Sequence, residues 1–391
     1  MNSRACPRCI RRGWLLAELG VLLDYRGRDP NRLLELFELD DETLIAAIAG
    51  RRRQEVTERW RRFTPQSLPA DGRVQHERIQ TICHHQPNWP ASLGHERLAP
   101  RALHLRAESD RLAELADGAT VAIVGSTRAS DYGAEMARMI ARGLAASGVR
   151  VVSAFAEGVS AAALTGALEG DGRPIAVLAG GVDVCKPAHM RALYERLSTR
   201  GCLVAELPCG FRERRWCGVA RTRVVAALAP VSVVVEAHAS VRELLVASVA
   251  GAMNRTVAAV PGRVSAPTAA GTCQLLRAGA PLVRDARDVL DLLHQAGATD
   301  GAPERAPACN SREGSRKRDR DGLLAPALER VLEEVAGGRD TLGRLTARGG
   351  DLAETMLALS QLELMGLLGR GDGGRYVPRE PLCGESIPAS G

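Results

Sequence analysis

The fold of this 391-residue chain is indicated most clearly by the segment Val121-Ala-Ile-Val-Gly-Ser-Thr-Arg-Ala-Ser-Asp-Tyr-Gly133. A short apolar run ends at Gly125, hydroxyl and arginine side chains follow, and a helix-like run extends to Ser147. This order of strand, loop and helix is typical of a Rossmann-type phosphate site, because the glycine lets backbone N–H groups approach an anion and the helix N-terminus adds a positive dipole. The stretch contains neither a G-x-G-x-x-G dinucleotide fingerprint nor a Walker A loop.

The same alternation continues along the middle of the chain. Apolar runs of four or five residues, rich in Val and Ile, alternate with amphipathic segments of helix length. The pattern predicts further strands at 149–153, 174–178, 202–205, 232–236 and 256–260, and helices at 158–169, 189–199 and 241–252. We therefore expect an α/β fold with an extended Rossmann-like, doubly wound and mostly parallel sheet, and a ligand site at the carboxyl ends of its strands.

Composition shifts predict how the chain divides. Residues 1–110 are predicted to form a helical domain of the helix-hairpin-helix (SAM-like) kind, with helices at 14–23, 31–39 and 41–50, the last capped by Asp40 or Asp41. Residues 111–296 form the predicted Rossmann-like core, and 297–322 a linker. Helices at 325–336, 341–347 and 352–368, followed by a Gly-rich turn and a strand at 371–377, predict a winged helix over 323–378, and 379–391 form a tail.

Charge and composition restrict the class of protein. The net charge is +6, and of 52 basic residues only Lys186 and Lys317 are lysine. Aromatic residues make up 3% of the chain, which argues against a broad aromatic platform for stacking bases. The chain has no apolar run of 18 residues and no apolar signal core of the usual form, so we expect a cytoplasmic protein with no membrane partner.

Several short motifs follow one another between about residues 80 and 295. They are Val121-Ala-Ile-Val-Gly-Ser126, Gly148-Val-Arg-Val-Val-Ser153 leading to Glu157-Gly158, Ile175-Ala-Val-Leu178 with Gly181-Val-Asp-Val184, Arg221-Thr-Arg-Val-Val-Ala226, Val234-Val-Glu-Ala237, and Ala259-Val-Pro-Gly262 with Gly271-Thr272. This ordered set resembles the DprA (Smf) family of DNA-processing proteins of natural transformation. The helical N-terminal region and the winged tail are also similar to that family.

The resemblance implies a protein without enzymatic activity and without a cofactor. Its relatives bind single-stranded DNA with little sequence preference, protect incoming DNA, form homodimers through the Rossmann domain and help to load the RecA recombinase. A glycine-lined anion site flanked by arginines suits backbone phosphates. The residues expected to contact DNA phosphates are Gly125, Ser126, Arg128, Gly158, Lys186, Arg221, Arg223, Gly262, Gly271 and Thr272.

Several positions depart from the family pattern. Thr127 stands where the family usually has Arg, and Glu157 reverses the charge of another Arg, which opposes anion binding. Ser160 and Leu164 replace an Asp and a His, the segment Ser240-Val-Arg-Glu243 replaces a small-residue loop, and Cys273 replaces an Asn. We expect Glu157 to pair with Arg128 or Arg223. The pattern indicates a divergent member with a partly rebuilt pocket.

Alternatives remain open for both residues and function. Gly125 and Ser126 also suit a tight strand-to-helix turn, Arg221 and Arg223 a solvated helix face, and Gly271-Thr272 the start of a helix. A Rossmann protein that binds a nucleotide without turnover is one alternative function. A phosphoribohydrolase-like enzyme is another, although Pro261-Gly-Arg263 and Gly271-Thr272 are separated here and the downstream Glu of that motif is absent.

The cysteines and the tail raise two further questions. Cys6-Pro-Arg-Cys9 has zinc-knuckle spacing, and Cys83 with His84 or His85 would complete a tetrahedral site, but a second C-x-x-C is missing. We therefore expect no metal and reduced thiols, with Cys6, Cys9, Cys83 and His85 as the zinc ligands if one binds.

The candidate recognition helix at 352–368 carries Glu354 and Glu363 but no Lys or Arg, which favours a protein contact over DNA.

Overall fold

The computed structural model describes residues 5–26, 29–64, 79–87, 89–94, 98–107, 118–297, 326–336, 345, 352–364, 367–371 and 375–378. The chain divides into two compact units, Met1–Pro303 and Glu304–Gly391, and each unit is described by itself. None of the described helices is long and apolar enough to cross a membrane.

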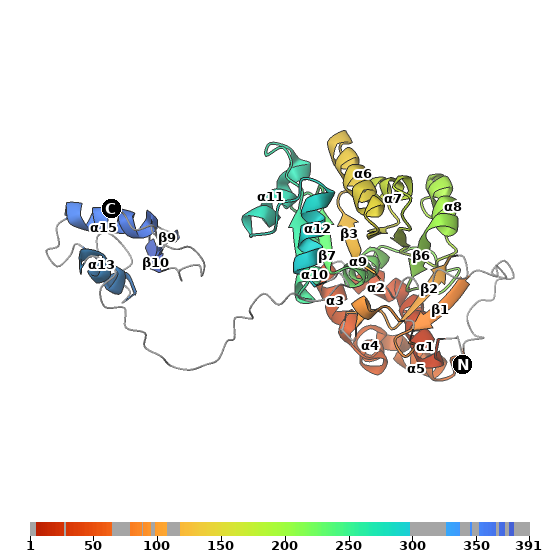
Figure 1. Cartoon of the computed structure of the whole chain (residues 1–391). Helices are drawn as coiled ribbons and strands as arrows, with labels where there is room; N and C mark the ends of the chain where they lie inside the picture. The colour runs from red at the N-terminus through yellow and green to blue at the C-terminus, as the bar shows by residue number, and fades with distance from the viewer. Residues whose placement is uncertain are drawn as a thin grey trace. The chain divides into compact units, whose positions relative to one another are not determined.

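An eight-stranded sheet forms the centre of the first unit (Figure 1). Its order is β1-β2-β6-β5-β4-β3-β7-β8, and the strands from β3 to β8 run parallel. Their bounds are β3 (Thr120–Val124), β4 (Arg150–Ala154), β5 (Ile175–Val177), β6 (Cys202–Ala205), β7 (Val231–Val234) and β8 (Thr256–Ala259). All six strands predicted for the middle region are confirmed, because short Val- and Ile-rich runs are typical of strands buried on both faces.

Two strands that the sequence did not predict extend one edge of the sheet. β1 (Ile79–Cys83) and β2 (Ala102–Arg106) pair antiparallel, and β2 runs antiparallel to β6. His104 interrupts the apolar pattern of β2, yet it is buried and its ring nitrogen lies 2.8 Å from the Thr81 hydroxyl. Burial lowers the pKa of His104 to about 4, so the ring is neutral near pH 7 and is compatible with a buried strand.

The order of the strands reverses beside β3. The chain passes from β3 to β4, β5 and β6 in one direction, and then returns to place β7 and β8 on the other side of β3. In open α/β sheets, ligands bind beyond the carboxyl ends of the strands near such a reversal. The observed topology therefore agrees with the predicted position of the ligand site.

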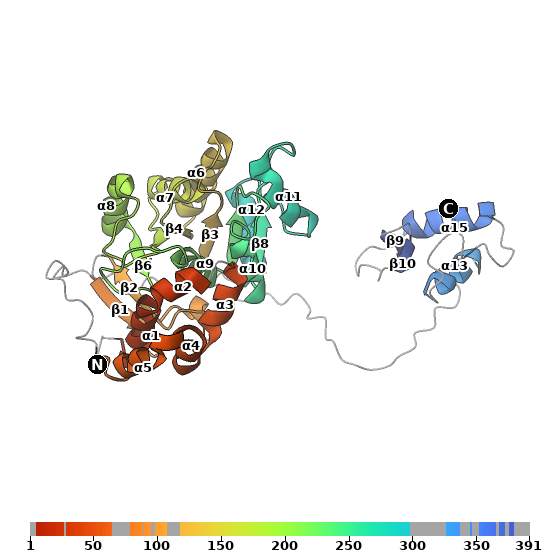
Figure 2. The ribbon, with the colours of Figure 1, turned by 180° about the vertical axis from the view of Figure 1, so that it is seen from behind.

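Helices cover both faces of this sheet (Figures 1 and 2). One face packs against α6 (Asp131–Ala146), α7 (Val159–Glu169) and α12 (Ala286–Gln295). The other packs against α9 (Cys217–Leu228) and α10 (Leu245–Ala252). Two further helices follow β5 and β8, namely α8 (Arg191–Arg200) and α11 (Ala270–Arg277). The helices predicted for the middle region are confirmed, except that the one at 241–252 begins later, at Leu245.

The N-terminal helices share a core with α9 and α10. They are α1 (Pro7–Glu18), α2 (Gly20–Arg26), α3 (Pro30–Glu38), α4 (Asp41–Ile48) and α5 (Arg53–Arg61). The single helix predicted at 14–23 is wrong, because Pro7 starts α1 earlier and α1 ends at Glu18, before α2 begins at Gly20. The cap of α4 is Asp40, whose side chain accepts the Thr43 backbone N–H at 2.9 Å.

A buried polar cluster joins four of these helices. The Arg12 guanidinium lies 3.0 Å from the Asp41 carboxylate and donates to the Phe37 carbonyl at 2.9 Å. The Trp60 indole N–H donates to the same carboxylate at 3.0 Å. Because the Asp41 carboxylate accepts from both Arg12 and Trp60, these buried charges are compensated.

The described residues of the second unit form two helices and a pair of antiparallel strands. They are α13 (Pro326–Ala336), α15 (Leu352–Leu364), β9 (Leu368–Gly371) and β10 (Arg375–Pro378), around a core that includes Leu328, Val331, Leu359 and Leu362. The helix predicted at 352–368 is too long, since α15 ends at Leu364 and Leu368 starts a strand. The helix predicted at 341–347 lies outside the described residues, apart from Leu345.

A glycine permits the close crossing of α6 and α7. A Cβ atom built on Gly166 of α7 would overlap the backbone carbonyl of Arg138 on α6. By contrast, a Cβ built on Gly251 of α10 has no neighbouring atom within 4 Å. The two helical glycines therefore offer a matched test of packing.

We predict that Gly166→Ala destabilises the chain by about 1–3 kcal/mol, since backbone must move to admit one methyl group. Gly251→Ala is expected to leave stability unchanged or to raise it by up to about 1 kcal/mol, because alanine is the better helix former. Urea unfolding of both variants measures the difference. Equal stability of Gly166→Ala and the unsubstituted chain would show that the crossing is looser than described.

Candidate functional site: a basic cavity at the carboxyl ends of β3 and β4

A cavity of about 380 Å³ lies beyond the carboxyl ends of β3 and β4. Val124 and Gly125 line it at the end of β3, and Ala154 lines it at the end of β4. Its other walls come from α7, α9, α10 and the residues that precede α9 and α10. This volume accommodates a small ligand or one nucleotide unit of a chain.

Three helices begin at this cavity. Ser160 in the first turn of α7, Gly218 in the first turn of α9 and Leu245 at the start of α10 all line it. A helix N-terminus carries a partial positive charge, because its first N–H groups have no acceptor within the helix. The three helix ends therefore add positive potential to the same space.

Side chains add further positive charge. Four arginines and two glutamates line the cavity: Arg214, Arg215, Arg221, Arg242, Glu213 and Glu243. The Glu243 carboxylate accepts the backbone N–H of His238 at 2.8 Å and lies 3.0 Å from its ring, and Arg214 pairs with Asp24 of α2 at 3.5 Å. The excess of guanidinium groups makes the cavity an electrostatic match for anions.

Arg221 is the most deeply placed of these cations. Its Nη1 donates to the Phe155 carbonyl at 3.1 Å, and its buried Nε has no acceptor among the described residues. Burial lowers the pKa of the Arg221 guanidinium, an effect that Glu213 and Cys217 partly offset, and arginine nevertheless stays protonated. Arg221 is half-buried, and a buried donor without an acceptor costs free energy, which an incoming anion would recover.

The loop after β3 is held by backbone contacts. A Cβ atom on Gly125 would lie 2.6 Å from the Glu236 carbonyl oxygen, and one on Gly158, whose φ is +70°, would overlap the Ser126 carbonyl. The buried Ser126 hydroxyl accepts the Arg128 backbone N–H at 3.1 Å. Gly125 and Ser126 thus form the tight turn that was their structural alternative, and Gly158 packs against it from the start of α7. Of these three residues only Gly125 lines the cavity.

The N-terminus of α6 does not offer the anion site that the sequence indicated. The Glu236 carboxylate accepts the backbone N–H and the hydroxyl of Ser130, at 2.9 and 2.6 Å, and a Cβ on Gly133 would overlap it. The chain's own carboxylate therefore lies where a phosphate was expected. The cavity that the structure does contain is lined by the start of α7, α9 and α10 instead.

Arg221 and Arg223 have different environments. Residues two positions apart on a helix point about 200° away from each other. Arg223 is 3% exposed, pairs with Glu206, donates to the Leu98 carbonyl and lies 4.8 Å from the Phe37 ring. The structure therefore corrects the expectation for Arg223, whose guanidinium is buried within the fold and does not line the cavity.

The remaining expected residues also lie apart from the cavity. Arg128 and Lys186 are exposed, after β3 and β5 respectively, and neither lines it. A Cβ on Gly262 would lie 2.6 Å from that of Ala269, Gly271 donates its N–H to the Ala237 carbonyl at 2.8 Å, and the buried Thr272 hydroxyl donates to the Ala269 carbonyl at 3.1 Å. These last three belong to the turn after β8 and the start of α11.

Glu157 has a different partner from the one expected. Its carboxylate lies 2.9 Å from Nε2 of His189, and not against Arg128 or Arg223. Both side chains are largely exposed, so the pair is worth little in stability. Glu157 does not line the cavity, so its carboxylate is not among the groups that a ligand there would contact.

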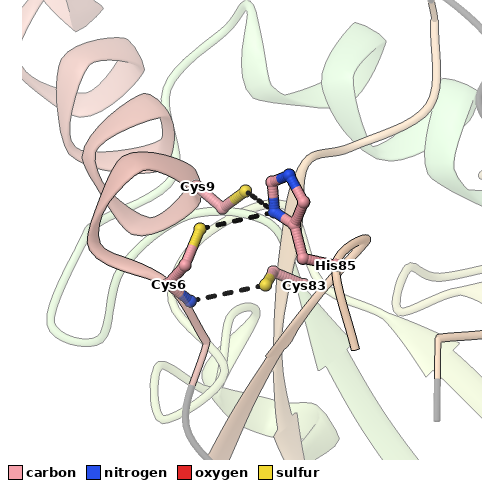
Figure 3. Close-up of side chains that lie close together, drawn as sticks. All are labelled: Cys6, Cys9, Cys83 and His85. Carbon is pink, nitrogen blue, oxygen red and sulfur yellow. Dashed lines mark hydrogen bonds between the residues drawn. The ribbon is translucent and has the colours of Figure 1, made fainter. Parts of the chain in front are cut away.

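Sequence reasoning missed Arg214, Arg215 and Arg242. The first two belong to the run Arg212-Glu-Arg-Arg215 directly before α9, a charge cluster at a helix start that could have indicated an anion site. Arg242 lies in the segment that was interpreted only as added bulk. The candidate zinc ligands are also brought together, although more than seventy residues separate them, and Figure 3 shows the cluster that they form.

Comparison with known proteins places these observations in a family. Residues 80–294 match the family model for DNA recombination-mediator protein A. A DNA processing protein DprA of Mycobacterium tuberculosis is 38% identical over 265 residues, which cover 67% of this chain and 65% of that protein. The Smf protein of Synechocystis is 27% identical over 324 residues, 78% of this chain and 81% of the relative.

Two solved structures are similar in fold. DNA processing protein A from Streptococcus pneumoniae superposes with a TM-score of 0.57 at 24% identity, covering 72% of this chain and 95% of that one. DNA processing protein A from Helicobacter pylori, whose structure is described in terms of its single-stranded DNA binding mode, superposes with a TM-score of 0.50 at 23% identity. The match covers 56% of this chain and 97% of that one. At these identities the likeness establishes the α/β fold with its N-terminal helices.

The different environments of Arg221 and Arg223 lead to a test of stability. Arg223→Ala is expected to destabilise the chain by about 3–5 kcal/mol, because Glu206 is left buried and unpaired. Arg221→Ala is expected to cost about 1 kcal/mol or less, since Arg221 has no such partner. Urea unfolding followed by tryptophan fluorescence, to which the buried Trp216 near Phe37 contributes, measures both.

A third variant separates charge from packing. Arg223→Met combined with Glu206→Leu removes both charges and should recover part of the stability that Arg223→Ala loses. If Arg223→Ala were as stable as Arg221→Ala, the buried ion pair would not hold this region together.

Proposed function

Since the chain belongs to the DNA recombination-mediator protein A family, we propose that its basic cavity binds the phosphate backbone of single-stranded DNA. The observation that carries the proposal is Arg221, a cation with an unsatisfied donor in a cavity where three helices begin. The Helicobacter pylori relative, described as a binder of single-stranded DNA, supports it. The chain spans only 65% of the length of its Mycobacterium tuberculosis relative, so activity and partners are proposed here for this chain.

The shape of the cavity favours a single strand over a duplex. A space of about 380 Å³ admits one phosphate with its sugar, whereas the stiff duplex presents its phosphates on a broad convex surface. Further cations for the neighbouring phosphates come from Arg215 and Arg242, which are exposed and line the cavity. Arg128 is also exposed and directly follows Thr127, another lining residue. A flexible strand can bend to satisfy both the cavity and its surroundings.

The chemistry of the walls predicts binding without sequence preference. The cavity is lined by no aromatic side chain among the described residues, so base stacking contributes little there. Guanidinium groups and helix N-termini recognise phosphates, which are the same for every base. The affinity should therefore depend strongly on salt and weakly on base identity.

The wider role follows the family. We propose that the chain acts without catalysis, as a homodimer, to protect single-stranded DNA and transfer it to the RecA recombinase during natural transformation. For the second unit we propose a winged helix that contacts protein, because Met356 and Leu357 on α15 are exposed. Apolar side chains at a helix surface suit a protein partner better than the DNA backbone.

A nucleotide is the second candidate ligand. The volume of the cavity lies in the range of small-molecule sites, and one phosphate of a nucleotide would meet the same arginine. Binding of a nucleoside monophosphate without turnover would make the chain a sensor or scaffold, and release of ribose phosphate would make it an enzyme. An assay for ribose phosphate released from a nucleoside monophosphate distinguishes these two outcomes.

We predict that fluorescence anisotropy detects salt-sensitive binding of labelled poly-dT to the full-length chain. Arg221→Ala should weaken this binding about 10- to 150-fold, since a hydrogen bond to a charged group is worth about 1.5–3 kcal/mol. Losing one phosphate contact should also lower the salt slope by about 0.7. Arg221 is chosen alone, because a substitution of Arg223 would mix folding with binding.

Arg287→Ala is the matched control, because Arg287 is an exposed arginine of α12 that does not line the cavity. It should change the affinity by less than about twofold. Equal losses in both variants would mean that DNA is held by net charge alone. Absence of DNA binding at low salt, together with displacement of a fluorescent nucleotide by a nucleoside monophosphate, would favour the second candidate.

A truncation tests the role of the second unit. A chain that ends after residue 322 keeps the basic run at 316–320 but lacks α13, α15, β9 and β10. We expect its poly-dT affinity and salt slope to equal those of the full chain, because the cavity lies in the first unit. A large loss of affinity would show that the second unit binds DNA.

A further inference from the structure

Four potential metal ligands converge at the edge of the sheet (Figure 3). The Sγ atoms of Cys6, Cys9 and Cys83 and a ring nitrogen of His85 all lie within 4.8 Å of one another. Nδ1 of His85 is 3.4 Å from both Cys6 Sγ and Cys9 Sγ. Three thiols and one imidazole form a donor set of the kind that structural zinc sites use.

We propose that these four side chains bind one structural Zn²⁺ ion. In a tetrahedral site, Zn–S bonds of about 2.3 Å and Zn–N bonds of about 2.0–2.1 Å place sulfur and nitrogen about 3.5 Å apart. The two observed distances of 3.4 Å are close to this edge length. These two distances already match a coordination sphere, and the other pairs of ligand atoms lie within 4.8 Å, so binding requires deprotonation of the thiols and a small contraction of the cluster.

Local structure accounts for the positions of the first two thiols. Cys6 is the N-cap residue of α1, with Pro7 as the first helical residue, and Cys9 follows in the first turn. The N–H groups of Cys9 and Ile10 donate to the Cys6 carbonyl at 3.1 and 3.2 Å, which closes the turn and turns both sulfurs to one side. The N-terminal end of this 12-residue helix favours thiolates, because its dipole is positive there.

The other two ligands come from the sheet. Cys83 is the last residue of β1, and His85 lies in the turn that follows. The Ala5 N–H donates to the Thr81 carbonyl at 3.2 Å, which brings the start of α1 beside β1. The Cys6 N–H then points at Cys83 Sγ at 3.4 Å, an N–H···S contact of the kind that stabilises a metal-bound thiolate.

Burial of the cluster supports a structural metal. Cys9 and Cys83 are 2% and 0% exposed and pack with Ala5 and Ala102. Four protein ligands complete a tetrahedron and leave no open position for a reacting water, as in structural sites. Three soft sulfurs with one nitrogen in this geometry favour zinc over magnesium, calcium or manganese.

His84 is the competing ligand. Its Nδ1 lies 3.5 Å from Cys9 Sγ, but also 3.2 Å from the Arg101 carbonyl, and its ring is 3.9 Å from that of His85. An imidazole N–H directed at a carbonyl cannot also bind a metal through the same nitrogen. His85, with two sulfurs at equal distance, is therefore assigned as the fourth ligand.

The proposed ion would join α1 to the β1–β2 edge of the sheet. It closes a loop of more than seventy residues between Cys9 and Cys83, so its binding free energy adds to the stability of the folded chain. The function of the ion is to fix the N-terminal helices in place. It takes no part in the DNA site proposed above, which lies at other elements.

Elemental analysis of the full-length chain, purified without chelators, tests the proposal. We expect about one zinc per chain, and at most one tenth of that in Cys83→Ser or His85→Ala. His84→Ala and Cys209→Ser are the controls, since Cys209 is a partly exposed cysteine outside the cluster, and both should keep the metal. Zinc loss in His84→Ala but not in His85→Ala would overturn the assignment of the fourth ligand.

A second measurement avoids variants that fail to fold. A strong chelator applied to the folded unsubstituted chain should remove the ion and lower the melting temperature, and re-added Zn²⁺ should restore it. Co²⁺ in its place should produce the intense visible absorption of a tetrahedral thiolate site. No bound zinc after purification and after reconstitution of the reduced chain would overturn the proposal, whatever its affinity for DNA.

Discussion

The hydrogen bonds between the Glu236 carboxylate and Ser130, at the N-terminus of α6, determine which part of the sheet's carboxyl edge is open to a ligand. Glu236 follows β7 and its carboxylate accepts the N–H and hydroxyl of Ser130, so it joins the end of β7 to the start of α6. A charge-assisted hydrogen bond to a helix N-terminus is strong in a buried place. With this part of the edge occupied by the protein itself, the positive potential that remains for a ligand comes from α7, α9, α10 and the arginines beside them.

The two arginines of α9 point to different sides of the helix and have different roles. Arg221 lines the cavity, while Arg223, about 200° around the helix, pairs with Glu206 and lies against Phe37 of α3. One helix therefore presents a cation to a ligand on one side and fastens the N-terminal helices on the other. The cavity and the packing of the N-terminal helices therefore use opposite sides of the same helix, α9.

Most of the sheet could be predicted from the sequence, because each parallel strand is a short Val- or Ile-rich run that turns interrupt. β1 and β2 could not, since His104 reads as polar although burial leaves it neutral. Of the cavity, only its location at the carboxyl edge and two of its lining residues, Gly125 and Arg221, were predicted, and their contact with a ligand stays a prediction. The phase of α9 determines that Arg221, and not Arg223, faces the cavity. The N-terminus of α6 is occupied by Glu236, which lies more than one hundred residues from Ser130 in the sequence.

The N-terminal helices are joined to the rest of the first unit at several places, two of which differ in their chemistry. At one place Arg223, Phe37 and the shared apolar core join α3 to α9; at the other, the cysteine cluster joins α1 to β1. The first is apolar packing with a buried ion pair and does not depend on thiol chemistry. The second contains three thiols, so oxidation, or loss of the proposed metal ion, would act there and not at the first. Release there would free the start of α1 while α3, α9 and the cavity keep their packing.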